Sequence, residues 1–234
     1  MVSNMDIKDN FLASFYQRHN QRRQEHLATL NLPIAGKTVL EIGAGIGDHT
    51  SFFIDRNCAV TCAEGRKELL DIFKQRFPEI PSFLWDIETE PPECIRESEV
   101  VYAYGILYHT KRPEKVLTFL ANLCTEFLLL ETCVSFGEEE LINITPENIN
   151  DPTQSIHGTG CRPTRAWVFK ILKQLFPFVY VTKTQPWHEE FPIDWNQLPK
   201  NNNENKLSRS IFVASKIQLY NANLSLNLIN KQER

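Results

Sequence analysis

The stretch from Thr38 to His49 constrains the fold of this chain more than any other. Val39, Leu40 and Ile42 form a short apolar run, which predicts a buried strand. Glycines follow at positions 43, 45 and 47, and glycine lets a ligand approach the backbone closely. A strand that ends in glycines and opens into a helix, here expected near Asp48, is typical of a cofactor-binding turn. The alternative is a tight turn without a ligand.

The spacing of this turn indicates the kind of cofactor. A dinucleotide turn has the pattern G-x-G-x-x-G and receives a pyrophosphate, whereas this turn reads E-x-G-x-G-x-G with Glu41 just before the glycines. A carboxylate there would repel a pyrophosphate and attract an ammonium group. The pattern resembles the first motif of class I S-adenosylmethionine-dependent methyltransferases, whose cofactor carries an amino-acid end and a sulfonium. The resemblance implies S-adenosylmethionine as the cofactor and S-adenosylhomocysteine as the product.

Composition limits the class of protein. The chain has 234 residues, of which 42% are hydrophobic and 23% charged, and this suits one globular domain with a full core. The net charge of −4 gives no sign of a nucleic-acid-binding surface, although a local basic patch stays possible. No apolar run is long enough for a membrane span, and no signal peptide is recognisable. The six scattered cysteines complete no metal site, so we expect reduced thiols in a cytoplasmic protein.

A helix is expected before the first strand, from Asp9 to Leu30, because apolar residues recur there at helical spacing. Residues 1–36 would form a helical cap. Two interpretations stay open: an amphipathic helix packed on the sheet with a solvated face, or a lid over the cofactor in which Tyr16, His19 or Arg22 touches it.

Two acids follow the next strands at positions that suit an adenosine. Glu64 ends a predicted strand from Ala59 to Ala63, lies 17 residues after Gly47, and could accept both ribose hydroxyls. The alternative is an acid that caps a helix or faces solvent. Asp86 follows a third strand over residues 82–85, and the family resemblance implies that it binds the adenine amino group, the alternative being a simple turn residue.

The reaction centre is expected after the fourth strand, which runs from Glu99 to Tyr104 and ends at Gly105. Ligands of open α/β sheets bind outside the carboxyl ends of the strands. His109 lies in this region and could take a proton from an acceptor. The alternative is a structural histidine that hydrogen-bonds the loop.

The remaining strands complete the predicted fold. A fifth strand is expected at residues 127–133, a sixth at 178–184 and a seventh at 210–215, with helices between them. We therefore predict a Rossmann-like, seven-stranded, mostly parallel sheet with an antiparallel last strand and helices on both faces. The methyltransferase domain would span residues 37–216, and residues 217–234 would be a polar tail.

Two long connections are expected on the substrate side. Residues 134–162 show no periodicity, which favours a functional loop, and Pro163 suits the first position of the following helix. Residues 185–207 begin with an aromatic, acid-rich part and continue into an asparagine-rich part. We expect the first part to form a substrate wall and Asn201 to Asn203 to form a mobile tip.

The site residues follow from these positions. The expected cofactor-binding residues are Glu41, Gly43, Ala44, Gly45, Gly47, His49, Glu64, Gly65, Arg66, Asp86, Ile87, Tyr104, Gly105 and Leu107. The candidates for a catalytic base are His109, His157 and His188. Expected substrate contacts are Tyr16, His19, Arg162, Arg165 and Trp187. Either arginine could hold an acidic group of the substrate, although Arg162 could equally fix its loop through an ion pair. We expect no metal.

The predicted activity is methyl transfer to an oxygen or nitrogen atom of a small molecule. A narrower likeness, carried by Gly105 to His109, Leu130 to Thr132 and Arg162 to Thr164, is similar to the bacterial tRNA wobble-uridine carboxymethyltransferase. An RNA-modifying enzyme is therefore the alternative, but the chain is net acidic and shows no extended basic region. A non-catalytic module is a third possibility, which the intact glycine turn and Glu64 disfavour. A homodimer is compatible with the sequence.

Overall fold

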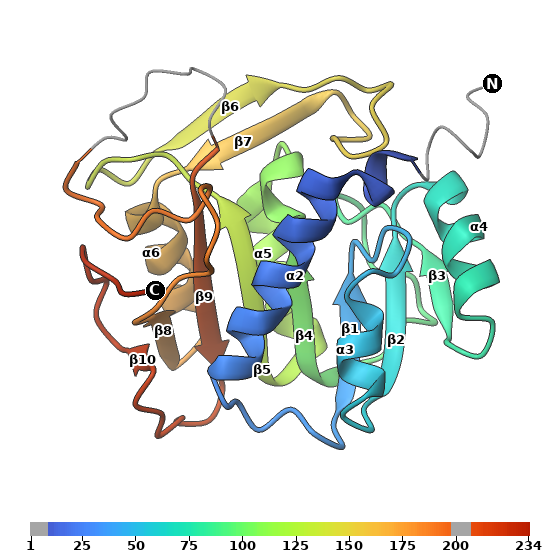
Figure 1. Cartoon of the computed structure of the whole chain (residues 1–234), viewed down its shortest axis with the longest axis horizontal. Helices are drawn as coiled ribbons and strands as arrows, with labels where there is room; N and C mark the ends of the chain where they lie inside the picture. Colours follow the sequence, from blue (N-terminus) through green and yellow to red (C-terminus); the bar gives the residue numbers. More distant parts are fainter. Residues whose placement is uncertain (1–8, 198–206) are drawn as a thin grey trace.

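The chain folds around a single large sheet (Figure 1). The computed structural model describes residues 9–197 and 207–234. The sheet has eight strands in the order β10-β8-β9-β5-β4-β1-β2-β3. Their bounds are β1 Thr38–Ile42, β2 Ala59–Glu64, β3 Ser82–Leu84, β4 Ser98–Tyr104, β5 Cys124–Cys133, β8 Phe178–Thr182, β9 Arg209–Ser215 and β10 Leu224–Ser225.

The strand directions confirm the predicted fold. Neighbouring strands from β3 through β2, β1 and β4 to β5 are parallel, and β9 is antiparallel to both β5 and β8. All seven predicted strands are present, and β10 adds an eighth that pairs antiparallel with β8. Because the parallel strands end at one edge of the sheet, the residues that follow them lie near one another.

Helices cover both faces of this sheet, as predicted. The helices α2 Ser14–Thr29, α3 Thr50–Ile54 and α4 Lys67–Arg76 contribute to one apolar cluster, and α5 Pro113–Leu123 and α6 Arg165–Leu175 to the other. The alternation along β4 shows how a strand serves both clusters: Val100 and Tyr102 pack on the first face, and Val101 and Ala103 on the second. No helix in the described part of the chain is long and apolar enough to cross a membrane.

The first two helices differ in extent from the sequence prediction. The helix expected from Asp9 to Leu30 breaks at Ala13, whose extended backbone (φ −57°, ψ 136°) separates a helical turn at residues 9–12 from α2. The helix expected near Asp48 begins at Thr50, because residues 45–49 form turns. It ends after five residues, since Asn57 takes a positive φ of 56°.

The expectation of an irregular stretch at 134–162 is wrong. This stretch contributes β6 Ile142–Pro146 and β7 Thr159–Pro163, which form a separate antiparallel sheet. Figure 1 shows this small sheet lying across the carboxyl ends of the parallel strands. Pro163 pairs with Ile142 as the last residue of β7, and Thr164 caps α6 by accepting a hydrogen bond from the Trp167 amide. Pro163 is therefore not the first helical residue.

The C-terminal residues are an ordered part of the sheet edge rather than a featureless tail. Leu224 in β10 is buried, and Gln232 is buried as well. The Gln232 side chain accepts hydrogen bonds from Trp195 Nε1 (2.7 Å) and Gln185 Nε2 (3.1 Å). The amides of Asn221 and Asn223 donate to carbonyls at the end of α2. Residues 217–234 thus tie the sheet edge to the N-terminal helix.

Candidate functional site

A large cavity opens at the edge where the parallel strands end. Its volume is about 1080 Å³. It is lined by α2, by the turns after β1, β2, β3, β4 and β5, by the β6–β7 connection, and by residues just before and at the start of β9. This is the usual place of ligand sites in open α/β sheets.

The glycine turn after β1 forms one wall of the cavity. Gly43, Gly45 and Gly47 all have positive φ (68°, 57° and 88°), which side chains rarely adopt. A Cβ atom at Gly43 would lie 3.1 Å from Ile106, and one at Gly45 would lie 3.4 Å from Phe11. Gly47 faces away from the cavity, because a Cβ there would lie 2.5 Å from Phe77 on the side of α4.

Glu41 lies beneath this turn and is almost fully buried. Its Oε2 accepts a hydrogen bond from Thr50 Oγ1 at 2.7 Å and contacts Cys62 Sγ at 3.5 Å. Burial raises the pKa of Glu41 to about 7, despite these two contacts. The carboxyl group lines the cavity but is also engaged with the start of α3, an arrangement that sequence alone did not indicate.

Glu64 ends β2 and points at the glycine turn. Its Oε2 accepts from the backbone N–H of Gly45 and its Oε1 from that of Arg66, both at 2.8 Å. Burial raises the pKa of Glu64, and the N–H donors oppose this effect. The structure thus brings Glu64, Gly65 and Arg66 to the cavity beside Ala44 and Gly45.

Asp86 follows β3 on the same side of the cavity, next to Ile87. Its Oδ2 lies 2.8 Å from His157 Nε2, and its Oδ1 accepts from the backbone N–H of Glu88. His157 therefore lies beside the expected adenine-binding acid.

The helix α2 forms part of the cavity wall, and its role as a lid stays a prediction. Tyr16 and His19 line the cavity. The helix is held by a buried ion pair between Arg23 and Glu131 (3.0 Å) and by a hydrogen bond from Asn20 to Asp48 (3.2 Å). Arg22 is not on the cavity wall; it pairs with Glu25 at the surface.

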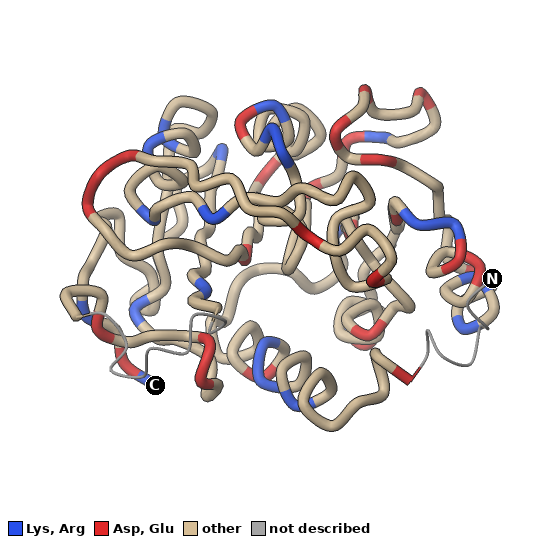
Figure 2. The backbone as a smooth tube through the Cα atoms, turned by 90° about the horizontal axis from the view of Figure 1, so that it is seen from above, with Lys and Arg blue, Asp and Glu red and all other residues tan. Residues whose placement is uncertain are grey.

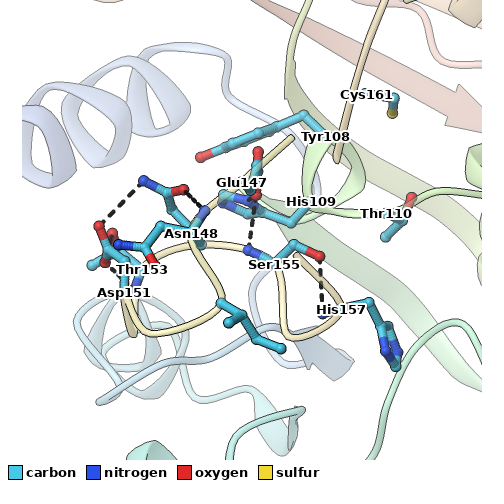
Figure 3. A network of polar contacts seen from close by, with 12 residues as sticks. Tyr108, His109, Thr110, Glu147, Asn148, Asp151, Thr153, Ser155, His157 and Cys161 are labelled. Atoms are coloured by element: carbon cyan, nitrogen blue, oxygen red, sulfur yellow. Dashed lines mark hydrogen bonds and ion pairs between the residues drawn. The ribbon is translucent and has the colours of Figure 1, made fainter. Parts of the chain in front are cut away.

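His109 lies in the 3₁₀ turn Leu107–His109 after β4 and belongs to a polar network (Figure 3). Its Nδ1 is 2.5 Å from Glu147 Oε2, and its side chain is mostly buried. Burial lowers the pKa of His109, although Glu147 opposes this shift. Sequence reasoning missed Glu147, because only the pairing of β6 with β7 brings residue 147 to this turn.

Two arginines on the cavity wall are held by carboxylates. Arg162 Nη2 donates to Glu147 Oε1 at 3.1 Å, as the ion-pair alternative expected. Arg209 donates to Glu131 (3.0 Å) and to Glu190 (2.6 Å). None of these three residues was assigned to the site from the sequence. Their signal was too weak, because each lies in an ordinary strand or connection.

Comparisons with known proteins bear on the fold. No family model and no curated protein matches the chain. Among solved structures, the N-terminal domain of EvdMO1 with S-adenosylhomocysteine and D-fucose is 17% identical in sequence to this chain and superposes with a TM-score of 0.64. The alignment covers 87% of this chain and 84% of the EvdMO1 domain. Magnesium protoporphyrin IX methyltransferase from Synechocystis PCC 6803, with bound S-adenosylhomocysteine, is 14% identical (87% and 85% covered, TM-score 0.55). A putative S-adenosylmethionine-dependent methyltransferase from Listeria monocytogenes is 13% identical (85% and 99% covered, TM-score 0.58).

The chain has the fold of class I methyltransferases. The cavity of this methyltransferase fold gathers most of the expected site residues. Those on its wall are Tyr16, His19, Glu41, Gly43, Ala44, Gly45, His49, Glu64, Gly65, Arg66, Asp86, Ile87, Tyr104, Gly105, His109, His157 and Arg162.

Five residues expected at the site from the sequence lie in the described part of the chain but do not line the cavity. Gly47 packs on α4 and Leu107 is fully buried in the core. Arg165 is buried 4.1 Å above the Trp195 ring, and burial lowers its pKa to about 9. Trp187 is 68% exposed. His188 is buried and packs against the His19 ring, off the cavity wall. The expected mobile tip at Asn201 to Asn203 lies outside the described residues.

His19, His188 and Glu190 form a cluster whose polar atoms lie within 4.8 Å of one another, as in some metal sites. The Nε2 atoms of both histidines are buried without a hydrogen-bond partner. However, His188 Nδ1 accepts a hydrogen bond from the Glu190 backbone N–H, so the neutral ring carries its proton on Nε2. A metal ion at His188 Nε2 would have to displace this proton and break the hydrogen bond that Nδ1 accepts from the Glu190 N–H.

Proposed function

We propose that the chain is an S-adenosylmethionine-dependent methyltransferase that acts on an oxygen or nitrogen atom of a small molecule. The observation that carries the proposal is Glu64, a buried carboxylate that meets the glycine turn at the end of β2. Structures of the same fold contain S-adenosylhomocysteine, which supports this cofactor.

The residues on the cavity wall fit the parts of this cofactor. Glu64 and Asp86 both line the cavity, and we expect Glu64 to accept the ribose hydroxyls and Asp86 the adenine amino group. Glu41 lies beneath the glycine turn, and an ammonium group or a sulfonium bound beside it would favour its ionised form despite the raised pKa. The bound cofactor would supply a methyl group on a positively charged sulfur. The protein's main task is then to align the acceptor, which can contribute several kcal/mol through proximity.

His109 is our candidate for the base. It is the histidine on the cavity wall that follows β4, and the lowered pKa keeps its ring neutral near pH 7. A neutral ring can take the proton that a hydroxyl or ammonium acceptor loses. His157 lies beside Asp86, on the side where we expect the adenine rather than the methyl group, and His188 is buried off the cavity, so both are weaker candidates.

The wall favours a neutral, hydroxyl-rich acceptor over an acidic one. The arginines of the described cavity wall are already engaged: Arg23 and Arg209 with Glu131, Arg162 with Glu147, and Arg66 with backbone carbonyls. An acidic acceptor would have to compete with the carboxylates that already pair with Arg23, Arg162 and Arg209. The EvdMO1 structure with D-fucose supports a sugar-like acceptor.

The proposal is tested first by binding and then by turnover. Calorimetry should show binding of S-adenosylhomocysteine and no binding of NAD. Transfer of a labelled methyl group should follow with neutral polyols or sugars, and neither acidic analogues nor tRNA should replace them. Binding of NAD without any response to S-adenosylhomocysteine would overturn the assignment, and methylation of tRNA alone would overturn the acceptor class.

A further inference from the structure

We propose that Glu147 is a positioning residue that fixes the orientation and the tautomer of His109, so that the two side chains act as a unit. This inference rests on the proposed methyl transfer, because it explains how His109 becomes an effective base. It concerns a carboxylate far from His109 in sequence, which the fold brings to the reaction centre.

The contacts of Glu147 leave its carboxylate little freedom. Glu147 directly follows β6, and its side chain is 4% exposed. Oε2 lies 2.5 Å from His109 Nδ1 and also accepts from the backbone N–H of Ser155 at 2.8 Å. Oε1 accepts from Arg162 Nη2 at 3.1 Å. Figure 3 shows Glu147 between the His109 ring and Ser155. Both carboxylate oxygens are thus held from different directions.

These contacts decide the protonation of the pair. Burial alone would raise the pKa of Glu147, but the hydrogen bonds from His109, Ser155 and Arg162 outweigh it and the pKa is lowered. An ionised carboxylate only accepts hydrogen bonds, so Nδ1 of a neutral His109 must carry the proton. Nε2 then keeps its lone pair and can accept a proton from a substrate. Glu147 thus orients the candidate base His109, as the third group of a catalytic triad orients its base.

The backbone around the pair is shaped to admit this carboxylate. A Cβ atom on Gly160 would lie 2.5 Å from Glu147 Oε1 and would also clash with the Tyr108 carbonyl oxygen. Gly160 and Arg162 lie two residues apart on β7, so they share one face of the strand. One residue makes room for the carboxylate and the other binds it. The contact with His109 connects this carboxylate to the turn after β4 as well as to its own hairpin.

The first test observes the tautomer directly and needs no acceptor. In ¹⁵N NMR spectra of the full chain with S-adenosylhomocysteine, the His109 ring should show a protonated Nδ1 and an unprotonated Nε2. His109→Gln assigns the signal. In Glu147→Ala the protonated-Nδ1 state should be lost or mixed with the other tautomer. A parent His109 ring that is protonated on Nε2 would overturn the proposal.

The second test measures turnover. Glu147→Gln keeps the size of the side chain but removes its charge. One carboxylate oxygen is replaced by an NH₂ group, which would face a hydrogen-bond donor of His109, Ser155 or Arg162. We expect kcat to fall by roughly 10²–10⁴-fold, with little change in S-adenosylhomocysteine affinity. Gly160→Ala should lower kcat as well, although it removes no polar group. The matched control is Glu138→Gln, an exposed acid on the preceding connection, which should behave like the parent.

The two tests separate this inference from the proposed function. Parent-like turnover in Glu147→Gln, with intact folding shown by circular dichroism, would overturn the positioning role. If no acceptor is ever methylated but His109 shows the expected tautomer, the proposed function fails and the pairing stands. Restoration of kcat by Glu147→Asp above the level of Glu147→Gln would support the role of the negative charge.

Discussion

At the scale of single residues, Glu64 carries the strongest expectation about cofactor binding. Its two oxygens meet the N–H groups of Gly45 and Arg66, so it both shapes the turn and faces the cavity. We expect Glu64→Ala to weaken S-adenosylhomocysteine binding by roughly 1–3 kcal/mol, since a charge-assisted hydrogen bond is lost. Isothermal titration calorimetry measures this. Glu79→Ala, an exposed acid after α4, is the control; equal affinities in both variants would place the cofactor elsewhere.

His109 carries the corresponding expectation about turnover. Its pKa is lowered by burial, while Glu147 opposes this shift and Arg162 and Arg209 reinforce it. The Tyr108 ring packs on it at 4.0 Å, and burial raises the pKa of this tyrosine, so that Tyr108 stays neutral. The base works only unprotonated, so kcat should stay level from pH 8 down to the ordinary histidine pKa of about 6.5 and fall only at lower pH, because burial lowers the pKa of His109 below that value.

Substitution of His109 separates a base from a positioning residue. His109→Ala should lose about 10²–10⁴-fold in kcat with almost unchanged cofactor affinity, the range typical of a lost general base. His109→Gln can keep a hydrogen bond to Glu147 but cannot accept a proton. Parent-like turnover in His109→Gln would contradict the assignment of His109 as the base.

At the scale of elements, Arg66 holds the β6–β7 connection to the cofactor side of the cavity, together with the contact between His157 and Asp86. Arg66 Nη2 lies 3.1–3.3 Å from the carbonyl oxygens of Ile149, Asp151, Gln154 and Ser155. Arg66→Ala should therefore speed amide hydrogen exchange in residues 148–157 and lower kcat, because Glu147 and Ser155 belong to this connection. Mass spectrometry of exchanged peptides measures this. Lys67→Ala, which loses only an exposed pair with Asp71, should leave the exchange unchanged.

The elements that sequence predicted well are those with their own local signal. The parallel strands are apolar on both faces and are bounded by turns or helices, so β1, β2, β4 and β5 could be placed within a few residues. β6 and β7 carry no such signal, because they are partly exposed and each is ordered by pairing with the other. The candidate site followed the same rule: residues at strand ends were found, whereas Glu147 and Arg209 depended on tertiary pairing.

At the scale of the whole molecule, the C-terminal residues close the sheet edge. Gln232 accepts from Trp195 and Gln185 and donates to Thr182, so its removal leaves several buried polar groups without a partner. We expect Gln232→Ala to lower the free energy of unfolding by about 1–3 kcal/mol. Urea unfolding followed by tryptophan fluorescence checks this. The neighbouring Lys231→Ala changes an exposed side chain and should unfold like the parent. A parent-like midpoint in Gln232→Ala would show that the tail contributes little.

Basic and acidic residues are mixed along much of the described part of the chain. Figure 2 shows basic and acidic residues interspersed over the backbone, with a basic run along α2. Even that helix is partly neutralised, since Arg18 pairs with Glu189, Arg22 with Glu25 and Arg23 with Glu131. This distribution is consistent with a small-molecule acceptor.

The pairing of the cavity arginines with neighbouring carboxylates and carbonyls has a consequence for how the protein should respond to ionic strength. The Debye length shortens from about 10 Å at 0.1 M salt to about 3 Å at 1 M, which weakens attraction between distant charges but hardly affects buried pairs in contact. The guanidinium groups of Arg23 and Arg209 exert little long-range attraction, because Glu131 and Glu190 lie against them. An acceptor that enters this cavity should therefore arrive without electrostatic steering, and kcat/KM should stay nearly constant as salt is added.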